Sequence, residues 1–588
     1  MSELLAAYYV AIEGVYRMRI FQIIAVAVFA ACVSKADMMM SGGMDSDASA
    51  DDKPAQKTPP PEKQKKTAEK AAQKNASKNG AKKAGNPEKE PLSPYEVDSD
   101  VFISVNEIDE SVLHCLKILD IKPAKLCSDA VFARRVYLDL TASLPTEDEV
   151  RAFLADKSPD KRGKLVDKLL ASEKFATLMT MRFGDMLRIK AEFPINLWPN
   201  AAQAYSRFIY DSLVRNDPYG AIVRKILTSE GSNFREGEVN FFRAMQARNS
   251  VSIASCAALS FMGMRYEKMP ETARHNLAAF FDRLSYKSTK EWKEEIVFAD
   301  PAKRAPFSGT LPDGSAVSLS ADADPRAAFA DWLTKKGNPY FSRAAANRIW
   351  SWLFGRAIVS PVDDMFADNR AVNAELLDAL ALKFEAYNFD IRKLCRLIVM
   401  SRTYQQSPIP RAKPSEAAKY FAAYPVRQLE AETAIDVICE ITGTGEIYES
   451  TTPEPYTKFP SGESAVALPD GSVTTSFLEL FGRPSRDTGL DSERAASPSA
   501  SQKLYMINSA HIRSKIENGA GIRPIYSKKP DEFLDTAYLL VLSRFPTKAE
   551  REAFYKIRDS RRKNDRGWTH YVDTVWALFN SEEFINKH

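Results

Sequence analysis

Helix-start signals followed by apolar side chains at helical spacing dominate the chain from Val101 onward. Ser128 precedes a stretch in which Phe132, Val136 and Leu140 recur every four positions, and this spacing places them on one face of a helix. Signals of this kind return along most of the remaining chain. A sequence with this pattern buries its apolar stripes by packing helices together, so we predict a mainly α protein.

Thr146 and Glu149 have the spacing of a capping box, in which two side chains satisfy the exposed amides of a helix start. The same pattern returns near the end of the chain at an offset of 401 residues. The matched pairs are Tyr137 and Tyr538, Pro145 and Pro546, Thr146 and Thr547, Glu149 and Glu550, and Phe153 and Phe554. The match has two explanations, a duplicated helical module or the same capping chemistry adopted twice. Under both, we expect a helical bundle at each end.

One region has the pattern of β structure. Within residues 296–319, the Asp313-Gly314 step lies between short alternating runs, which is typical of a hairpin turn. We therefore predict two helical-bundle domains, at residues 95–290 and 326–588, joined by a small β-hairpin connector at residues 291–325.

The start of the chain indicates export. Arg17 and Arg19 precede an apolar run of about fourteen residues that ends at Val33, and a membrane span needs roughly 20. Ser34-Lys35-Ala36 supplies small residues where a signal peptidase cuts, so we predict a signal peptide over residues 1–36 and a periplasmic or cell-envelope location. Lipoprotein processing at Cys32 is one alternative, and an uncleaved anchor is the other. Of the two, the lipid at Cys32 is the membrane attachment that we favour.

Residues 37–94 are rich in Lys, Ala, Pro and Glu and poor in large apolar side chains. Such a segment buries too little surface to offset its ordering entropy, so we predict a disordered tether. Residues 51–90 alone contribute +5 to the net charge of +4, and residues 1–50 contribute −2, which leaves +1 for the remaining chain. This nearly neutral remainder gives no support for a nucleic-acid partner.

The usual catalytic motifs are missing from the sequence. It contains no C-x-x-C, no H-E-x-x-H and no P-loop. What remains is a set of Arg, Asn, Asp and Trp side chains within apolar helices. One interpretation is structural, because Arg–carboxylate pairs commonly tie helices and loops together. The other is a cleft in which Arg and Asn bind an anionic or hydroxylated ligand over an aromatic floor.

The candidate ligand-binding residues are Arg135, Asn240, Arg243, Asn347, Arg348, Trp352, Arg356, Arg486 and Arg494. The weaker candidates for acid–base catalysis are Asp139, Asp363, Asp364 and Glu493. Trp350 and Trp352 face different ways on a helix, so at most one of them lines a site.

Two sets of strings resemble known domains. The first resembles the cytochrome-associated domain of unknown function found in planctomycetes, and consists of Asp129-Ala-Val-Phe-Ala-Arg-Arg-Val-Tyr-Leu-Asp-Leu-Thr and Leu144-Pro-Thr. The second resembles the planctomycete-specific domain that follows it, and includes Asn338-Pro-Tyr-Phe-Ser-Arg, Asn347-Arg-Ile-Trp and Phe354-Gly-Arg-Ala-Ile-Val. The resemblance implies an exported protein of no established activity, with a sulfatase-like protein as a partner.

The chain departs from this family where many members carry C-x-x-C-H. The corresponding string is Phe261-Met-Gly-Met-Arg-Tyr-Glu-Lys-Met-Pro, which has no cysteine. Covalent haem needs two thiols and an axial His, so we expect no haem. Leu490-Asp491-Ser492 and Asn373 replace further Cys and His positions of the family. We expect no metal and no other cofactor.

Three functions are compatible with these observations. The first is an exported envelope protein that binds a polysaccharide, or a partner protein in glycan processing, without catalysis. The second is a hydrolase of a sulfated or acidic glycan, in which two of the candidate carboxylates act as the acid–base pair. The third is a structural scaffold with no small ligand.

Overall fold

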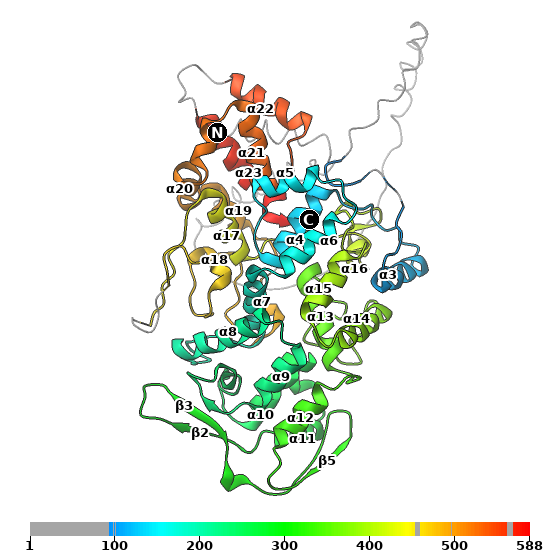
Figure 1. The fold of residues 1–588 in the computed structure, drawn as a ribbon, viewed down its shortest axis with the longest axis vertical. Coiled ribbons are helices and arrows are strands. Elements are labelled where there is room, and N and C mark those ends of the chain that lie inside the picture. The colour runs from blue at the N-terminus through cyan, green and yellow to red at the C-terminus, as the bar shows by residue number, and fades with distance from the viewer. Residues whose placement is uncertain (1–92, 98, 100, 453–458, 496, 561–567) are drawn as a thin grey trace, which may run out of the picture. The chain divides into compact units, whose positions relative to one another are not determined.

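The computed structural model describes residues 93–97, 99, 101–452, 459–495, 497–560 and 568–588. Helices make up most of these residues, which confirms the prediction of a mainly α protein (Figure 1). The predicted signal peptide, Cys32 and nearly all of the predicted tether lie outside the described residues. Within the described ranges, no helix has both the length and the apolar character needed to cross a membrane.

The helices fall before and after a segment that contains most of the strands. Those before it are α3 (Glu107–Ile118), α4 (Asp129–Thr141), α5 (Glu147–Ala155), α6 (Lys161–Leu170), α7 (Glu173–Met186), α8 (Pro199–Val214), α9 (Tyr219–Thr228), α10 (Ser250–Ala257) and α11 (Glu271–Ala279). Those after it are α12 (Pro325–Leu333), α13 (Phe341–Phe354), α14 (Ala374–Ala386), α15 (Ile391–Met400), α16 (Pro414–Lys419), α17 (Ala431–Thr442), α18 (Ser476–Leu480), α19 (Ala500–Asn508), α20 (Ala510–Asn518), α21 (Pro530–Leu542), α22 (Lys548–Ser560), α23 (Thr569–Phe579) and α24 (Glu582–Ile585).

The strands form three small antiparallel sheets. The strands are β1 (Gly231–Ser232), β2 (Leu284–Ser288), β3 (Glu295–Ala299), β4 (Phe307–Thr310), β5 (Ala316–Leu319), β6 (Arg427–Gln428) and β7 (Asn586–Lys587). The first sheet has the order β1-β3-β2, and the other two are the pairs β4-β5 and β6-β7. The prediction of one β region is therefore wrong. β1 and β2 precede that region, and β6 and β7 lie far beyond it.

Two apolar clusters hold the helices together. The larger one contains buried side chains from both predicted domains, and rings meet across it, as where Tyr219 stacks on Phe341 at 5.0 Å between centroids. The smaller one is built from α17 to α24, and Leu138 of α4 joins it. Packing therefore links the beginning of the described chain to its end.

The repeat noted in the sequence has the same local structure in both copies. α4 and α21 have the same bounds at an offset of 401 residues, and their C-caps, Ala142 and Ser543, are both left-handed. Thr146 and Glu149 form the predicted capping box, and Thr547 and Glu550 make the equivalent pair of hydrogen bonds. The two copies touch, because α5 packs against α21.

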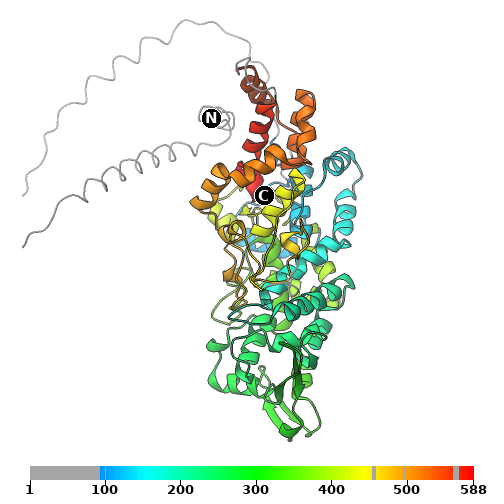
Figure 2. The same ribbon diagram turned by 90° about the vertical axis from the view of Figure 1, so that its left-hand side faces the viewer.

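Charged side chains fasten these ends to each other. Arg134 donates to the carbonyls of Val541 at 2.7 Å and Phe584 at 3.0 Å. Arg544 forms a two-bonded pair with Glu583, with both N–O distances at 2.7 Å, and the Tyr95 hydroxyl donates to the same carboxylate at 3.0 Å. In Figures 1 and 2, α22 and the neighbouring helices that make these contacts lie opposite the end of the molecule that carries β2 and β3.

The Arg544–Glu583 pair is buried, so breaking it should be costly. Glu583→Gln keeps the shape of the side chain and leaves the Arg544 guanidinium with one carboxylate instead of two. We expect the free energy of unfolding, measured by urea titration, to fall by about 3 kcal/mol. The neighbouring Glu582 pairs with Lys503 on the surface, so Glu582→Gln should change it by less than about 1 kcal/mol. Equal effects of the two substitutions would contradict this account.

The same pair predicts a pH dependence. Burial opposes ionisation of Glu583, but the charge and hydrogen bonds of Arg544 outweigh it and lower the pKa to about 2. The carboxylate of the unfolded chain has a pKa of about 4.3. A lowered pKa in the folded state stabilises the protein above the unfolded pKa, and this stabilisation is lost as the pH falls toward 2. The stability difference between the wild type and Glu583→Gln should therefore be constant from pH 7 to 5.5 and shrink below about pH 4.5.

Candidate functional site

A network of buried charges lies where α4, α7, α17 and the two-stranded β6-β7 sheet meet. No side chain in it exposes more than 20% of its surface, and positive and negative groups alternate. We call these residues the buried charge network: Asp139, Arg182, Asp185, Arg427, Glu430, Glu432, Arg486, Arg494 and Lys587.

Asp139 occupies one end of this network. Its Oδ1 accepts from Arg427 at 2.6 Å and lies 3.3 Å from the Lys587 ammonium, while its Oδ2 accepts from the Tyr404 and Tyr424 hydroxyls, both at 2.8 Å. Burial opposes its ionisation, but Arg427 and Lys587 outweigh burial and lower its pKa. The carboxylate is therefore ionised and fully used by internal partners.

Arg494 joins two carboxylates of the network, those of Glu432 and Asp185. It makes two hydrogen bonds to Glu432, at 2.7 and 3.0 Å, and its nearer bond to Asp185 is 2.8 Å. Arg486 donates to the other oxygen of Asp185 at 2.9 Å. A Cβ added at Gly184 would lie 3.0 Å from the guanidinium carbon of Arg486, so the absence of a side chain there lets this arginine cross α7.

A separate ion pair joins α13 to the loop that follows it. Arg348 and Asp363 are both buried and 2.9 Å apart, and the second oxygen of Asp363 accepts from the amide of Asp491 at 2.7 Å. Asn347 holds the same loop, because its side chain bonds the backbone of Ile358 and Val359.

A small pocket opens beside Arg348 and Arg494. Its volume is about 30 Å³, which exceeds the roughly 10–15 Å³ that a cavity needs to hold one water molecule. The residues that line it are Arg182, Asp185, Met186, Arg348, Trp352, Pro484, Gly489, Leu490, Asp491, Glu493 and Arg494. Arg348, Trp352, Glu493 and Arg494 are sequence-predicted site residues. Trp350 is instead fully buried and stacks on Phe354 at 4.0 Å.

The carboxylates of this pocket differ in whether other residues already bind them. Glu493 accepts from the amides of Asp487 and Thr488, at 3.1 and 2.5 Å, and so holds its own loop. Asp491 is exposed as a residue, and its carboxylate makes no hydrogen bond or ion pair with another described residue. The protein packed around this carboxylate raises its pKa, although Arg348 opposes the shift. Asp491 is thus the one pocket carboxylate, among the described residues, that is not already engaged.

The other predicted residues lie outside the pocket. Arg135 is buried, with its guanidinium 3.6 Å from the centre of the Tyr424 ring. Asp364 pairs with Lys268 at 2.6 Å. Arg356 is half-buried and makes no hydrogen bond or ion pair with any described residue.

Asn240 and Arg243 support the β1-β3-β2 sheet. Arg243 pairs with Glu295 of β3 at 2.9 Å, and Asn240 donates to the carbonyl of Asn233 at 2.8 Å. The charged pocket residues that were not among the predicted candidates are Arg182, Asp185 and Asp491. Arg182 and Asp185 lie three positions apart in an apolar helix, a spacing that could have marked them as a pair.

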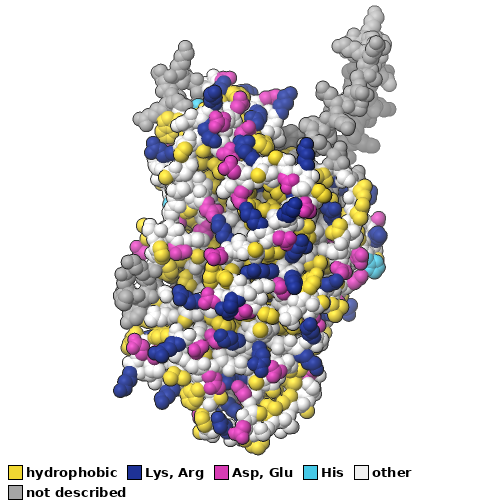
Figure 3. Space-filling model, viewed as in Figure 1, with side chains coloured by type: hydrophobic (Ala, Val, Ile, Leu, Met, Phe, Trp, Pro, Cys, Tyr) yellow, Lys and Arg dark blue, Asp and Glu magenta, His cyan; other side chains and the backbone are white. Residues whose placement is uncertain are grey.

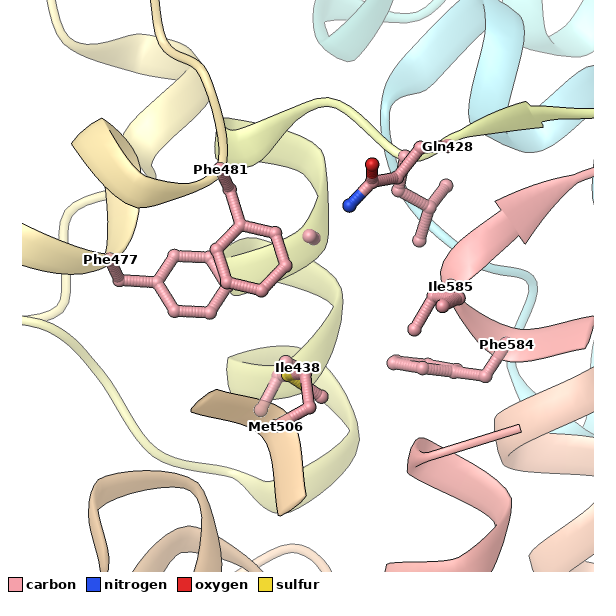
Figure 4. A pocket seen from close by; sticks show the side chains of 9 residues that line it. Gln428, Ile438, Phe477, Phe481, Met506, Phe584 and Ile585 are labelled. Atoms are coloured by element: carbon pink, nitrogen blue, oxygen red, sulfur yellow. The ribbon is translucent and has the colours of Figure 1, made fainter. Parts of the chain in front are cut away.

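A second, apolar cavity lies between α17, α18, α19 and α24 (Figure 4). Its volume is about 10 Å³, and Ile438, Phe477, Phe481, Met506 and Phe584 surround it. A cavity of this size and polarity does not hold a ligand or an ordered water molecule. It is a packing gap.

Two family models match most of the described chain. Residues 107–280 match PSCyt2 and residues 325–557 match PSD1, each described as a protein of unknown function (DUF1549 and DUF1553, respectively). The chain carries the PSCyt2 and PSD1 domains, in that order. The resemblance drawn from the sequence strings is thereby confirmed. No curated protein and no solved structure matches the chain.

The pocket lies at the junction of these two domains. Arg182 and Asp185 come from the PSCyt2 domain, whereas Arg348, Trp352 and the 484–494 loop come from the PSD1 domain. The buried charge network also joins the domains, through Arg494–Asp185 and Arg427–Asp139. Among the described residues, no group of three or more His, Cys, Asp or Glu side chains is placed to hold a metal ion.

The PSCyt2–PSD1 contact should depend on Asp139. Asp139→Asn removes a buried charge and leaves Arg427 and Lys587 without their shared partner, so we expect the free energy of unfolding to fall by about 3–5 kcal/mol. Asp331→Asn removes the exposed partner of Arg224 and should cost less than about 1 kcal/mol. Denaturant titration of both variants compares the two, and an Asp139→Asn variant as stable as Asp331→Asn would contradict a role for this network.

Proposed function

We propose that this protein is an exported cell-envelope protein that binds a neutral polysaccharide without catalysis, at the pocket between its PSCyt2 and PSD1 domains. One observation carries the proposal: the pocket combines three guanidinium groups, three carboxylates and the half-buried indole of Trp352. As part of this proposal, the two domains are helical bundles joined by the β4-β5 hairpin.

The balance of charge favours hydroxyl groups over anions. Arg182, Arg348 and Arg494 already pair with Glu430, Asp363 and Glu432, respectively. A sulfate or carboxylate ligand would also face the negative charges of Asp491 and Glu493. A sugar hydroxyl both donates and accepts hydrogen bonds, so it suits a lining that offers groups of both kinds. Figure 3 shows the same balance on one face, where basic and acidic side chains are interspersed.

The size of the pocket limits what enters it. A volume of about 30 Å³ admits a single hydroxyl or hydroxymethyl group, while the sugar ring itself must stay outside. Trp352 is the aromatic side chain of the lining and offers an apolar surface to the C–H groups of such a ring. We therefore expect shallow, side-on binding of a chain rather than enclosure of one sugar.

Hydrolysis of an acidic glycan is the second candidate, and the raised pKa of Asp491 favours it. A carboxyl with a raised pKa is suited to act as a general acid. The pair would need a second free carboxylate, however, and Asp139, Asp363 and Glu493 are held by internal hydrogen bonds. Binding is therefore the better supported function.

Export, with a lipid at Cys32 as the alternative to a cleaved leader, and a sulfatase-like partner protein belong to this proposal as well. They rest on the apolar leader and on the resemblance of the sequence strings.

Native gel electrophoresis in gels that contain a polysaccharide tests the pocket directly. We expect retardation in at least one neutral gel, made with barley β-glucan, xylan or galactomannan, and weaker retardation by dextran sulfate. Asp491→Asn should weaken binding roughly tenfold, since hydrogen bonds to charged groups contribute about 1.5–3 kcal/mol. Asp322→Asn, the same change at an exposed surface site, should leave it unchanged. Stronger retardation by dextran sulfate than by every neutral polysaccharide would refute the pocket proposal. Retardation that is unchanged in Asp491→Asn would also refute it.

A further inference from the structure

Two tryptophans from distant parts of the chain meet on the surface near β2 and β3. Trp292 lies in the turn between these strands and is 62% exposed. Trp198, which precedes α8, meets it edge to face at 6.5 Å between ring centroids. The Lys293 ammonium lies over both rings, 5.2 Å from the centroid of Trp292 and 5.7 Å from that of Trp198. We call these three residues the tryptophan platform.

The backbone beneath the platform is held by hydrogen bonds. The buried side chain of Asn233 donates to the carbonyl of Lys293 at 3.2 Å and accepts from the amide of Glu295 at 2.8 Å. The carboxylate of Glu294 accepts from Ser232 at 2.5 Å and from Thr289 at 2.8 Å. The turn is therefore fixed before any ligand arrives, which lowers the entropy lost on binding.

Asn240 and Arg243 extend this framework to the second tryptophan. Asn240 donates to the carbonyl of Asn233, and Arg243 donates to the side chain of Asn240 at 3.0 Å and to the carbonyl of Leu197 at 3.4 Å. One set of buried polar side chains thus positions both the Trp292 turn and the residue before Trp198. Two predicted binding residues act here as positioning residues.

We propose that the tryptophan platform is a second polysaccharide contact, on which a neutral pyranose ring stacks its C–H face. Indole rings supply a large, rigid apolar surface, and a sugar ring offers the complementary apolar face with hydroxyls around its edge. Lys293 and Glu291 lie beside Trp292, so groups able to donate to and accept from those hydroxyls are available. The ligand class rests on the proposed function, but the surface is a different one.

The charges around Trp292 argue against a membrane as the partner. Lys290, Glu291 and Lys293 are exposed within two positions of it. Inserting the indole into a bilayer interface would bring the Glu291 carboxylate toward the apolar layer, which is costly. A hydrated polysaccharide imposes no such cost, because these groups keep their hydrogen bonds to water or exchange them for bonds to hydroxyls.

The same affinity gels, run with full-length protein, test the platform. Trp292→Ala removes an exposed side chain, so the fold should survive, and circular dichroism checks this. We expect the dissociation constant for the retained neutral polysaccharide to rise roughly tenfold, as for a central aromatic contact. Trp568→Ala is the matched control, because Trp568 is 41% exposed and lies elsewhere, against Tyr526. It should leave retardation unchanged.

The variants separate this inference from the pocket proposal. Loss of binding in Trp292→Ala but not in Asp491→Asn would support the platform and refute the pocket, and the reverse result would refute the platform and support the pocket. No retardation of the wild type in any neutral gel would overturn both. Two further results would overturn the platform alone: Trp292-dependent sedimentation with phosphatidylcholine–phosphatidylglycerol vesicles, or Trp292-dependent dimerisation in size-exclusion chromatography, each with unchanged retardation in Trp292→Ala.

Discussion

The contact between the two domains depends on ion pairs that are removed from water. Taking charged side chains into the protein interior costs several kcal/mol each, and only close pairing with further hydrogen bonds offsets this cost. Around Asp139 this condition is met by Arg427, Lys587 and two tyrosine hydroxyls. A different arrangement of the helices would leave these charges unpaired, so the network favours one relative placement of α4, β6 and β7.

This constraint also decides what chemistry is left for function. Carboxylates that hold the domains together cannot exchange protons with a substrate without weakening the fold. Asp139 is of this kind, Asp363 is held by Arg348 and the amide of Asp491 within the PSD1 domain, and Glu493 is bound to its own loop. The groups that can meet a ligand are those that the network does not bind, chiefly Asp491 and Trp352. Such a surface suits recognition of hydroxyl groups better than bond cleavage.

Local signals in the sequence correctly predicted where individual helices begin. The capping box at Thr146 begins α5, and α22 begins at the equivalent position after Thr547, although it continues further than α5 does. Pairings between distant segments were not predictable, because β6 and β7 each contain two residues and have no periodicity to detect. The candidate site shows the same division. Arg348 and Trp352 stood out as unusual in an apolar helix, but their neighbour Asp491 comes from a loop that only the tertiary fold brings near.

The two proposed contacts together explain how a protein with so small a pocket could retain a polymer. A single hydroxyl in the pocket or a single stacked ring gives weak binding, because most of the sugar stays in water. A polysaccharide, however, presents the same group many times, and a second contact on one chain then acts at a high effective concentration. Weak sites that are already fixed in place lose little entropy on engagement, and here Asn233 fixes one and the Arg348–Asp363 pair borders the other. Affinity should therefore rise steeply with chain length, and short oligosaccharides should bind poorly.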